Sequence, residues 1–491
     1  MLRRLVGSEM CIRDSNWESV IGLEIHVQLN SESKIFSNAP TKFGSDQNLQ
    51  ACEVDLGMPG TLPVLNEKAI EKAIKFGVAI NAEIAEKVGF ARKNYFYPDL
   101  PKGYQISQLD DPIVGKGSIE IQLGDQESKT IGITRAHLEE DAGKSIHDLF
   151  ENETAIDLNR AGTPLLEIVS EPDMSNSEEA VAYLKKIHSI VCALEISDGN
   201  MSQGSMRCDA NVSVRKKGEK KLGTRTELKN INSFKFVEKA INFEIKRQIS
   251  CLEKGEEIVQ ETRPYDATNN TTRSMRSKEE ANDYRYFPEP DIIPIQITPD
   301  QIQRIKNELP ELPDEKKERF INELGLSEYD ARNLTYDLEL ADFFEKTLVN
   351  IDDPKLVANW ILGDFSAILN KFDAEANNSK VDVVKFAELL TYLKEEKISG
   401  QATKKVLENI WENPDVSVSK SIQGLGLEQI SDDNEIEEII EKVINNNPDQ
   451  KEQFLSGKDR LFGFFVGQVM KESKGKANPK LVNEILKRKL V

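Results

Sequence analysis

Apolar and polar residues alternate in the segment 20–29, Val-Ile-Gly-Leu-Glu-Ile-His-Val-Gln-Leu. This period of two is typical of a β-strand, because successive side chains of a strand point to opposite faces of the sheet. One face would carry Glu24, His26 and Gln28, and the other face would be apolar. Glu24 and His26 would lie about 7 Å apart along the strand, so that a carboxylate and an imidazole could bind one cation. The alternative is an ordinary surface strand with a polar face.

The sequence beyond the first fifteen residues divides into three parts by its pattern. Residues 16–294 hold short alternating segments separated by Gly and Pro, with helical stretches such as 177–194 among them. Strands and helices do not alternate regularly there, which predicts an α+β fold with a mostly antiparallel sheet. Helical patterns then dominate, so we expect a helical domain at 295–405 and a small helical tail domain at 406–491. The last segment, 477–490, has the spacing of an amphipathic helix.

Residues 1–15 fit neither pattern. Charged residues interrupt their apolar ones, so the apolar core of a signal peptide does not form. We expect a disordered leader, or one that is foreign to the mature protein.

Charge and cysteine content indicate where the protein works. The five cysteines form no Cys-x-x-Cys pair, which favours reduced thiols and a cytoplasmic setting. No apolar run reaches the length of about 18 residues that a membrane-spanning helix needs. The net charge of −20 argues against a nonspecific nucleic-acid binder. Residues 458–491 nevertheless carry nine Lys and Arg against three Asp and Glu, which indicates either RNA contact or a solvated helix face.

A second concentration of charge lies in the segment 134–145. Glu139, Glu140 and Asp141 follow His137 on an otherwise strand-like stretch. Three adjacent carboxylates repel one another unless a cation or an arginine lies among them. A metal site is therefore one interpretation, and a solvated turn is the other.

Further candidate residues are spread over the first 294 positions. Lys93 lies in an aromatic segment, 92–107, that is either a packed lid or a surface for a planar ligand, and it could also be an ordinary exposed lysine. The remaining candidates are acids and cations: Arg160, Arg207, Asp209, Glu227 and Lys229. No serine-hydrolase, paired Cys/His or zinc-protease motif is present. Carboxylates with cations around them favour the binding of Mg²⁺ and a nucleoside triphosphate.

Taken in order, these segments resemble the B subunits of heterotrimeric aspartyl/glutamyl-tRNA(Asn/Gln) amidotransferases, over residues 17–491. The resemblance implies a strand-rich cradle domain, a helical domain and a tail that holds tRNA. It implies that ATP and Mg²⁺ are used to phosphorylate the side-chain carboxylate of Glu on tRNA(Gln) or of Asp on tRNA(Asn), and it leaves open which of the two is the substrate. Ammonia released from glutamine by the A subunit, a glutaminase, would displace the phosphate, and the C subunit would complete the complex.

The resemblance also assigns residues. It implies a metal site at Glu24, His26 and Glu140, with Asp209 and Glu227 around the same cavity. It implies catalytic roles for Glu140, for the adjacent Glu139 and for Lys93, the last at the mouth of the ammonia route. For the nucleotide we expect Arg160, Arg207 and Lys229.

One segment departs from the family pattern. Some members carry a Cys-x-Cys and Cys-x-x-Cys zinc site after the first strand, where this chain has Ser37, Ala39, Cys52 and Asp55. One thiol and one carboxylate cannot build a tetrahedral structural zinc site. We therefore expect no zinc there.

Two other functions remain open from the sequence. A non-catalytic scaffold that presents charged tRNA would not need Glu24, His26 and Glu140 to converge. A free-standing metal-dependent phosphohydrolase would be active without partners, whereas we expect the isolated chain to be inactive with glutamine.

Overall fold

The computed structural model describes residues 16–124, 127–150, 152–277, 284–428, 433–458, 460–473 and 476–490, so the expected leader at 1–15 lies outside the described residues. The chain forms two compact units, residues 1–315 and 316–491. Each unit has hydrophobic core clusters of its own. The domain boundaries that we expect near 294 and 405 remain predictions.

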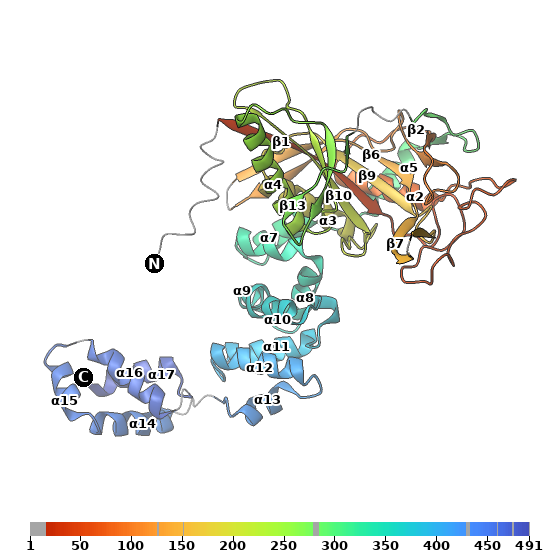
Figure 1. Ribbon diagram of the computed structural model, residues 1–491. Helices are drawn as coiled ribbons and strands as arrows, with labels where there is room; N and C mark the ends of the chain where they lie inside the picture. Colours follow the sequence, from red (N-terminus) through yellow and green to blue (C-terminus); the bar gives the residue numbers. More distant parts are fainter. Residues whose placement is uncertain are drawn as a thin grey trace. The chain divides into compact units, whose positions relative to one another are not determined.

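A nine-stranded sheet forms the centre of the first unit (Figure 1). Its strands are β1 (Trp17–Gln28), β5 (Gly117–Leu123), β6 (Glu127–Glu140), β9 (Pro164–Ser170), β10 (Met206–Lys216), β11 (Thr226–Lys229), β12 (Glu261–Asp266), β13 (Thr271–Thr272) and β14 (Arg276–Ser277). They follow the order β13-β12-β11-β10-β1-β9-β6-β5, and β14 pairs with β12. The β11–β12 pair is parallel and the other pairs are antiparallel. The prediction of an α+β fold with a mostly antiparallel sheet is confirmed.

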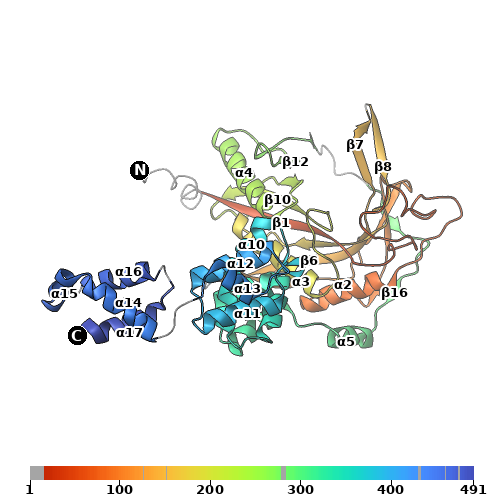
Figure 2. The same cartoon turned by 90° about the horizontal axis from the view of Figure 1, so that it is seen from below.

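Helices cover the apolar face of this sheet (Figure 2). They are α2 (Glu67–Ala79), α3 (Ser177–Ala193) and α4 (Phe234–Glu253). Each begins after a residue whose side chain accepts a hydrogen bond from a backbone N–H of the first turn: Asn66, Asn176 and Ser233. Leu23, Ile25 and Val27 of β1 are buried in the core cluster that these helices share. The other face of β1 is left to its polar side chains.

Smaller elements complete the first unit. Three short strands form one sheet, β15 (Phe287–Pro288), β3 (Ala91–Asn94) and β4 (Tyr104–Ser107). Two-stranded sheets pair β16 (Ile295–Gln296) with β2 (Lys87–Val88), and β7 (Lys144–Phe150) with β8 (Glu153–Asp157). Helix α5 (Pro299–Asn307) packs on α2.

The second unit is helical. Its helices, counted from the one that crosses the unit boundary, are α6 (Pro313–Asn322), α7 (Glu328–Tyr336), α8 (Leu338–Leu348), α9 (Pro354–Trp360), a π-helical turn (Ile361–Phe365), α10 (Ser366–Phe372), a 3₁₀ turn (Ala376–Asn378), α11 (Val383–Lys394), α12 (Gly400–Glu412), α13 (Val418–Leu425), α14 (Asp433–Asn445), α15 (Pro448–Leu455), α16 (Leu461–Glu472) and α17 (Pro479–Leu490). One core cluster extends from Phe320 to Ile422, and a second one, formed mainly by α14, α16 and α17, extends from Ile436 to Leu490. In the described part of the chain, no helix combines the length and the apolar character needed to cross a membrane.

Candidate active site

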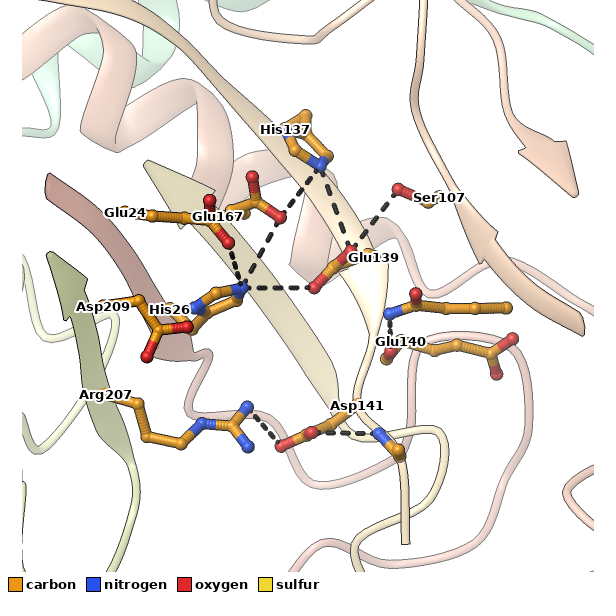
Figure 3. A network of polar contacts seen from close by, with 12 residues as sticks. Glu24, His26, Ser107, His137, Glu139, Glu140, Asp141, Glu167, Arg207 and Asp209 are labelled. Carbon is orange, nitrogen blue, oxygen red and sulfur yellow. Dashed lines mark hydrogen bonds and ion pairs between the residues drawn. The ribbon is translucent and has the colours of Figure 1, made fainter. Parts of the chain in front are cut away.

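Polar side chains form a grid on the face of the sheet that carries Glu24, His26 and Gln28. The strand register places His137 of β6 beside Glu167 of β9, Glu167 beside His26 of β1, and His26 beside Arg207 of β10. These four residues form one row across the sheet (Figure 3). Because side chains alternate along each strand, residues two positions away point to the same face and form the adjacent rows.

The adjacent row contains Arg135, Val169, Glu24 and Asp209, again on β6, β9, β1 and β10. Lys229 of β11 donates a hydrogen bond to Asp209. The row therefore has a cation at each end and two carboxylates on neighbouring strands near its middle. Two of the acids expected from the sequence and the expected cation Lys229 lie together here.

His26 is the centre of the acidic cluster. Its Nε2 lies 3.5 Å from Glu167 Oε2, 3.6 Å from Glu24 Oε1 and 3.8 Å from Glu139 Oε1. Burial by itself would lower the pKa of His26. The hydrogen bond to Glu167 and the negative charges of the three carboxylates outweigh burial and raise this pKa to about 9. Without a metal ion, His26 is thus protonated at neutral pH.

The carboxylates divide into two kinds. Burial raises the pKa of Glu139 to about 7, and the charge of Glu167 adds to the shift. Burial also raises the pKa of Glu24, with the same contribution from Glu167. Burial would raise the pKa of Glu167 too, but its hydrogen bond to His26 and the nearby positive charges outweigh burial and lower it. The cluster therefore holds more carboxylates than it can keep charged without a further cation.

His137 lies at the edge of the cluster and is neutral. Its Nε2 is 3.5 Å from Glu167 Oε2 and 3.9 Å from Glu139 Oε2. Burial lowers the pKa of His137 to about 4; Glu167 opposes this shift, and the positive charges of Arg135, His26 and Lys93 add to it. Its Nδ1 is buried without a hydrogen-bond partner among the residues that the structure describes.

The structure does not bring the Glu140 carboxylate to this cluster. Glu139 and Glu140 are consecutive on β6, so their side chains point to opposite faces. Glu140 binds Lys102, with Nζ 2.6 Å from Oε2, and its Oε1 accepts a hydrogen bond from the Ile106 N–H at 2.8 Å. Of the three metal ligands expected from the sequence, Glu24 and His26 lie in the cluster and Glu140 does not. Glu139 and Glu167 lie there in its place.

Arg160 and Arg207, two of the expected nucleotide-binding residues, are held by Asp141. Arg207 Nη2 donates to Asp141 Oδ2 at 2.9 Å, and Arg160 Nε lies 3.6 Å from the same oxygen. Arg160 also donates to the carbonyls of Ala142 and Gly143, at 2.9 and 2.7 Å. Both guanidinium groups thus have partners within the protein.

Two other expected residues lie beside the cluster. Lys93 stacks on the ring of Tyr284, with Nζ 5.0 Å from the ring centroid. Burial would lower the pKa of Lys93, but nearby negative charges, first that of Glu139, outweigh burial and raise this pKa. Glu227 lies 3.2 Å from Lys229 Nζ and accepts a hydrogen bond from Thr262 Oγ1 at 2.6 Å.

A cavity of about 520 Å³ continues the same face of the sheet beyond Glu24. The floor of the cavity is formed by β1 and β10, where Gly22 pairs with Asn211 and Val20 pairs with Ser213. The cavity is further lined by Leu23, Glu24, Val169, Ser170, Pro172, Leu222, Gly223, Thr224, Arg225 and Gln260. A smaller hollow of about 120 Å³ shares Glu24, Asn211, Arg225 and Gln260 with it and adds Glu227 and Glu261. A mixed apolar and polar cavity of this size is typical of small-ligand sites.

The cluster fits a divalent cation. Two groups of residues offer ligand atoms: Glu24 with His26 and Asp209, and His26 with Glu139 and Glu167. Within each group the ligand atoms lie within 4.8 Å of one another. That spacing accommodates ligand distances of about 2.0–2.3 Å around a central ion. Several carboxylates with one imidazole suit Mg²⁺ or Mn²⁺. Glu227 and Glu140 belong to neither group.

Hydrogen bonds join the four positions at which some family members carry zinc-binding cysteines. Asp55 accepts from Ser37 Oγ, from the Cys52 N–H and from Lys34 Nζ, each at 3.0 Å. The Lys34 side chain is fully buried, and burial lowers its pKa. Ala39 N–H donates to Ser37 Oγ at 3.4 Å. The absence of zinc remains a prediction.

Glu167 and Arg225 were not among the residues expected from the sequence. The sequence indicates that Glu167 lies on a strand, on the same face as Leu165 and Val169. Its position opposite His26 depends on the pairing of β1 with β9, which no local pattern predicts. Arg225 lies in the segment 222–225, which lines the cavity.

Comparison with known proteins identifies the family of this chain. The family profile described as the GatB/GatE catalytic domain matches residues 19–303, and a profile described as the GatB domain matches residues 342–490. Several curated relatives are named as the B subunit of aspartyl/glutamyl-tRNA(Asn/Gln) amidotransferase. The protein of Vesicomyosocius okutanii subsp. Calyptogena okutanii is 59% identical over 476 residues, which cover 97% of this chain and 100% of the relative. That of Thioalkalivibrio sulfidiphilus is 59% identical over 96% of this chain and 99% of the relative, and that of Hahella chejuensis is 56% identical over the same shares. With both profiles and near-complete coverage, the chain belongs to the GatB family, the B subunits of aspartyl/glutamyl-tRNA(Asn/Gln) amidotransferases.

Proposed function

We propose that this chain phosphorylates the side-chain carboxylate of an amino acid attached to tRNA, and that ammonia then converts the acyl phosphate to the amide. The substrates would be Glu on tRNA(Gln), Asp on tRNA(Asn) or both. The observation that carries this proposal is the convergence of Glu24, Glu139, Glu167 and Asp209 around His26, next to a cavity large enough for a nucleotide.

The chemistry explains why such a cluster is needed. A carboxylate is a poor acyl donor, whereas an acyl phosphate has a good leaving group. Phosphoryl transfer brings several negative charges together, and a divalent cation held by the cluster would neutralise them. In this proposal, Glu24, His26 and Asp209 form one side of the cation site, and Glu139 and Glu167 form the other side.

The cavity beside Glu24 supports a position for ATP. Its apolar walls suit a base, and Asn211 and Ser213 offer hydrogen bonds to a base or a ribose. Arg225 lines both hollows and makes no side-chain hydrogen bond or ion pair with a residue in the described ranges. We therefore propose Arg225, with Lys229, for the phosphates, in place of Arg160 and Arg207, which Asp141 holds.

The amide nitrogen must come from elsewhere, because the sequence shows no amidase nucleophile motif. The proposal therefore includes a glutaminase partner (the A subunit of the complex), the small C subunit, and Lys93 at the point where ammonia arrives. Charged tRNA would be held by the basic C-terminal segment, and the complex would work in the cytoplasm with ATP and Mg²⁺.

Amide formation by the assembled complex tests this proposal, with ammonium as donor so that the glutaminase is bypassed. Glu24→Gln and Glu139→Gln remove cluster carboxylates at nearly constant volume, and we expect each to lower the rate by about 100-fold or more. Glu18→Gln is the matched control, because Glu18 lies on the same face of β1 as Glu24 but pairs with Arg215 away from the cluster. Full activity of both cluster variants would instead support the scaffold function.

A further inference from the structure

Arg135 differs from every other partly buried arginine that the structure describes. The others have partners. Arg92 binds Glu289 and Arg207 binds Asp141, and each remaining one forms an ion pair, a hydrogen bond or a cation–π contact. The Arg135 side chain makes no hydrogen bond or ion pair with any residue in the described ranges, although it is partly buried. A guanidinium group withdrawn from water without a partner is unfavourable, so this position indicates an anionic ligand.

The strand register places Arg135 on the face of the sheet that carries Glu24 and His26. Arg135 pairs with Val169, and Val169 pairs with Glu24, so only the small Val169 side chain separates the arginine from the cluster in that row. Arg135 lies two residues before His137 on the same face of β6. Burial lowers the pKa of His137, and the positive charges of Arg135 and Lys93 add to this shift. Arg135 and His137 therefore lie on β6, on the side of the acidic cluster that is away from β10.

Arg225, whose side chain also makes no hydrogen bond or ion pair within the described ranges, lies on the opposite side of the cluster. Arg225 lines the cavity beyond Glu24, whereas Arg135 does not line it. Along the sheet, Arg135 is on β6, and the cavity floor is on β1 and β10. A nucleotide in the cavity would thus present its phosphates to Arg225 and the cluster, leaving Arg135 for the group that receives the phosphoryl group.

We propose that Arg135 binds the side-chain carboxylate of the aminoacyl group and holds it against the cluster. A guanidinium group can hold a carboxylate through two parallel N–H···O bonds, which fixes its plane as well as its position. This inference rests on the proposed function for the identity of the ligand, and it names Arg135 as the residue that distinguishes the acidic substrate from its amide product.

Binding to the assembled complex tests this inference without ATP, and therefore independently of any phosphorylation. The two ligands are Glu-tRNA(Gln) and Gln-tRNA(Gln), which differ by one carboxylate against one amide. We expect the wild type to bind Glu-tRNA(Gln) more tightly, and Arg135→Gln to raise the Kd for this ligand by roughly 10-fold or more. The Kd for Gln-tRNA(Gln) should change by less than about twofold, since the amide cannot form the charged pair.

Arg135→Lys keeps the charge but loses the planar fork, so we expect it to recover part of the preference. Arg225→Gln should leave the preference intact, because Arg225 faces the cavity. Equal weakening of both ligands by Arg135→Gln would assign Arg135 to a tRNA phosphate and overturn the inference. Unchanged Kd values for both ligands would overturn it as well.

Discussion

At the scale of single residues, His26 organises the site. It lies within 3.8 Å of three carboxylates, and its protonated form partly balances their charge. A divalent cation could take over this balance, because the same Nε2 belongs to both candidate ligand groups. The imidazole would then have to lose its proton, since a metal binds the free electron pair of the nitrogen.

This exchange predicts a pH dependence of metal binding. The pKa of His26 is raised to about 9 in the absence of a cation, so below that pH a proton must leave as the metal enters. We expect the affinity for Mn²⁺ to increase by about tenfold per unit between pH 7 and 8, where His26 must lose its proton, and more steeply below pH 7, where Glu139 must lose one as well. Titration calorimetry with the full-length chain measures it. An affinity that is constant over this range would contradict the assignment of His26 as a ligand.

The residues of the site also show what the sequence can predict. The alternation in β1 correctly places Glu24 and His26 on one face. The sequence does not decide whether Glu139 or Glu140 faces the site. The two are consecutive on a strand, so one carboxylate points to each face of the sheet, whichever face carries the site. The register between β6, β9 and β1 decides this in favour of Glu139, and such pairing between distant segments has no local signature.

At the scale of elements, β1 is both the centre of the sheet and the floor of the site. Gly22 is the position where this strand presents no side chain to the cavity. A Cβ atom at Gly22 would meet its nearest atoms at 3.9 Å, an ordinary contact distance. Valine is also favoured in strands, so Gly22→Val should fold.

The Gly22→Val variant tests the position proposed for the nucleotide. Its side chain would occupy part of the cavity floor, so we expect the KM for ATP to rise by about tenfold or more. The KM for aminoacyl-tRNA, measured on the same variant, should stay within about twofold of the wild type and serves as the internal control. A normal KM for ATP would place the nucleotide elsewhere.

The loop between β1 and α2 depends on a buried ion pair. Lys34 and Asp55 lie 3.0 Å apart, and Lys34 Nζ also donates to the Leu158 carbonyl at 3.3 Å. Lys34→Met would leave the Asp55 carboxylate buried without its cation, and we expect a loss of about 3–5 kcal/mol in unfolding free energy. Hydrogen exchange of the β9 amides measures this loss. Lys42→Met, at an exposed position of the same loop, is the control, and equal stability of the two variants would contradict a structural role for the pair.

Helices were easier to predict than pairings. The helix expected at 177–194 is α3, Ser177–Ala193, and the one expected at 477–490 is α17, Pro479–Leu490. Both have a local apolar period that is sufficient to define them. The ion pair of Arg207 with Asp141 joins residues 66 positions apart and depends on the tertiary fold.

At the scale of the whole molecule, the chain combines an acidic site with a basic end. The net charge is −20, four carboxylates lie around His26, and residues 458–491 hold a basic excess. In the proposed function, the acids serve the cation and the phosphoryl group, while the basic segment serves the tRNA. The scaffold alternative explains the basic segment but gives no reason for four acids around His26.

The most direct measurement follows the oxygen atoms of the substrate through one turnover. Glu-tRNA(Gln) is prepared with ¹⁸O in both side-chain carboxylate oxygens, and the assembled complex receives ATP, Mg²⁺ and ammonium. If the carboxylate attacks the γ-phosphate and ammonia then displaces the phosphate, the released phosphate carries one ¹⁸O for each amide formed. Phosphate released without ¹⁸O while the amide accumulates would contradict the acyl-phosphate route and, with it, the function proposed for the His26 cluster.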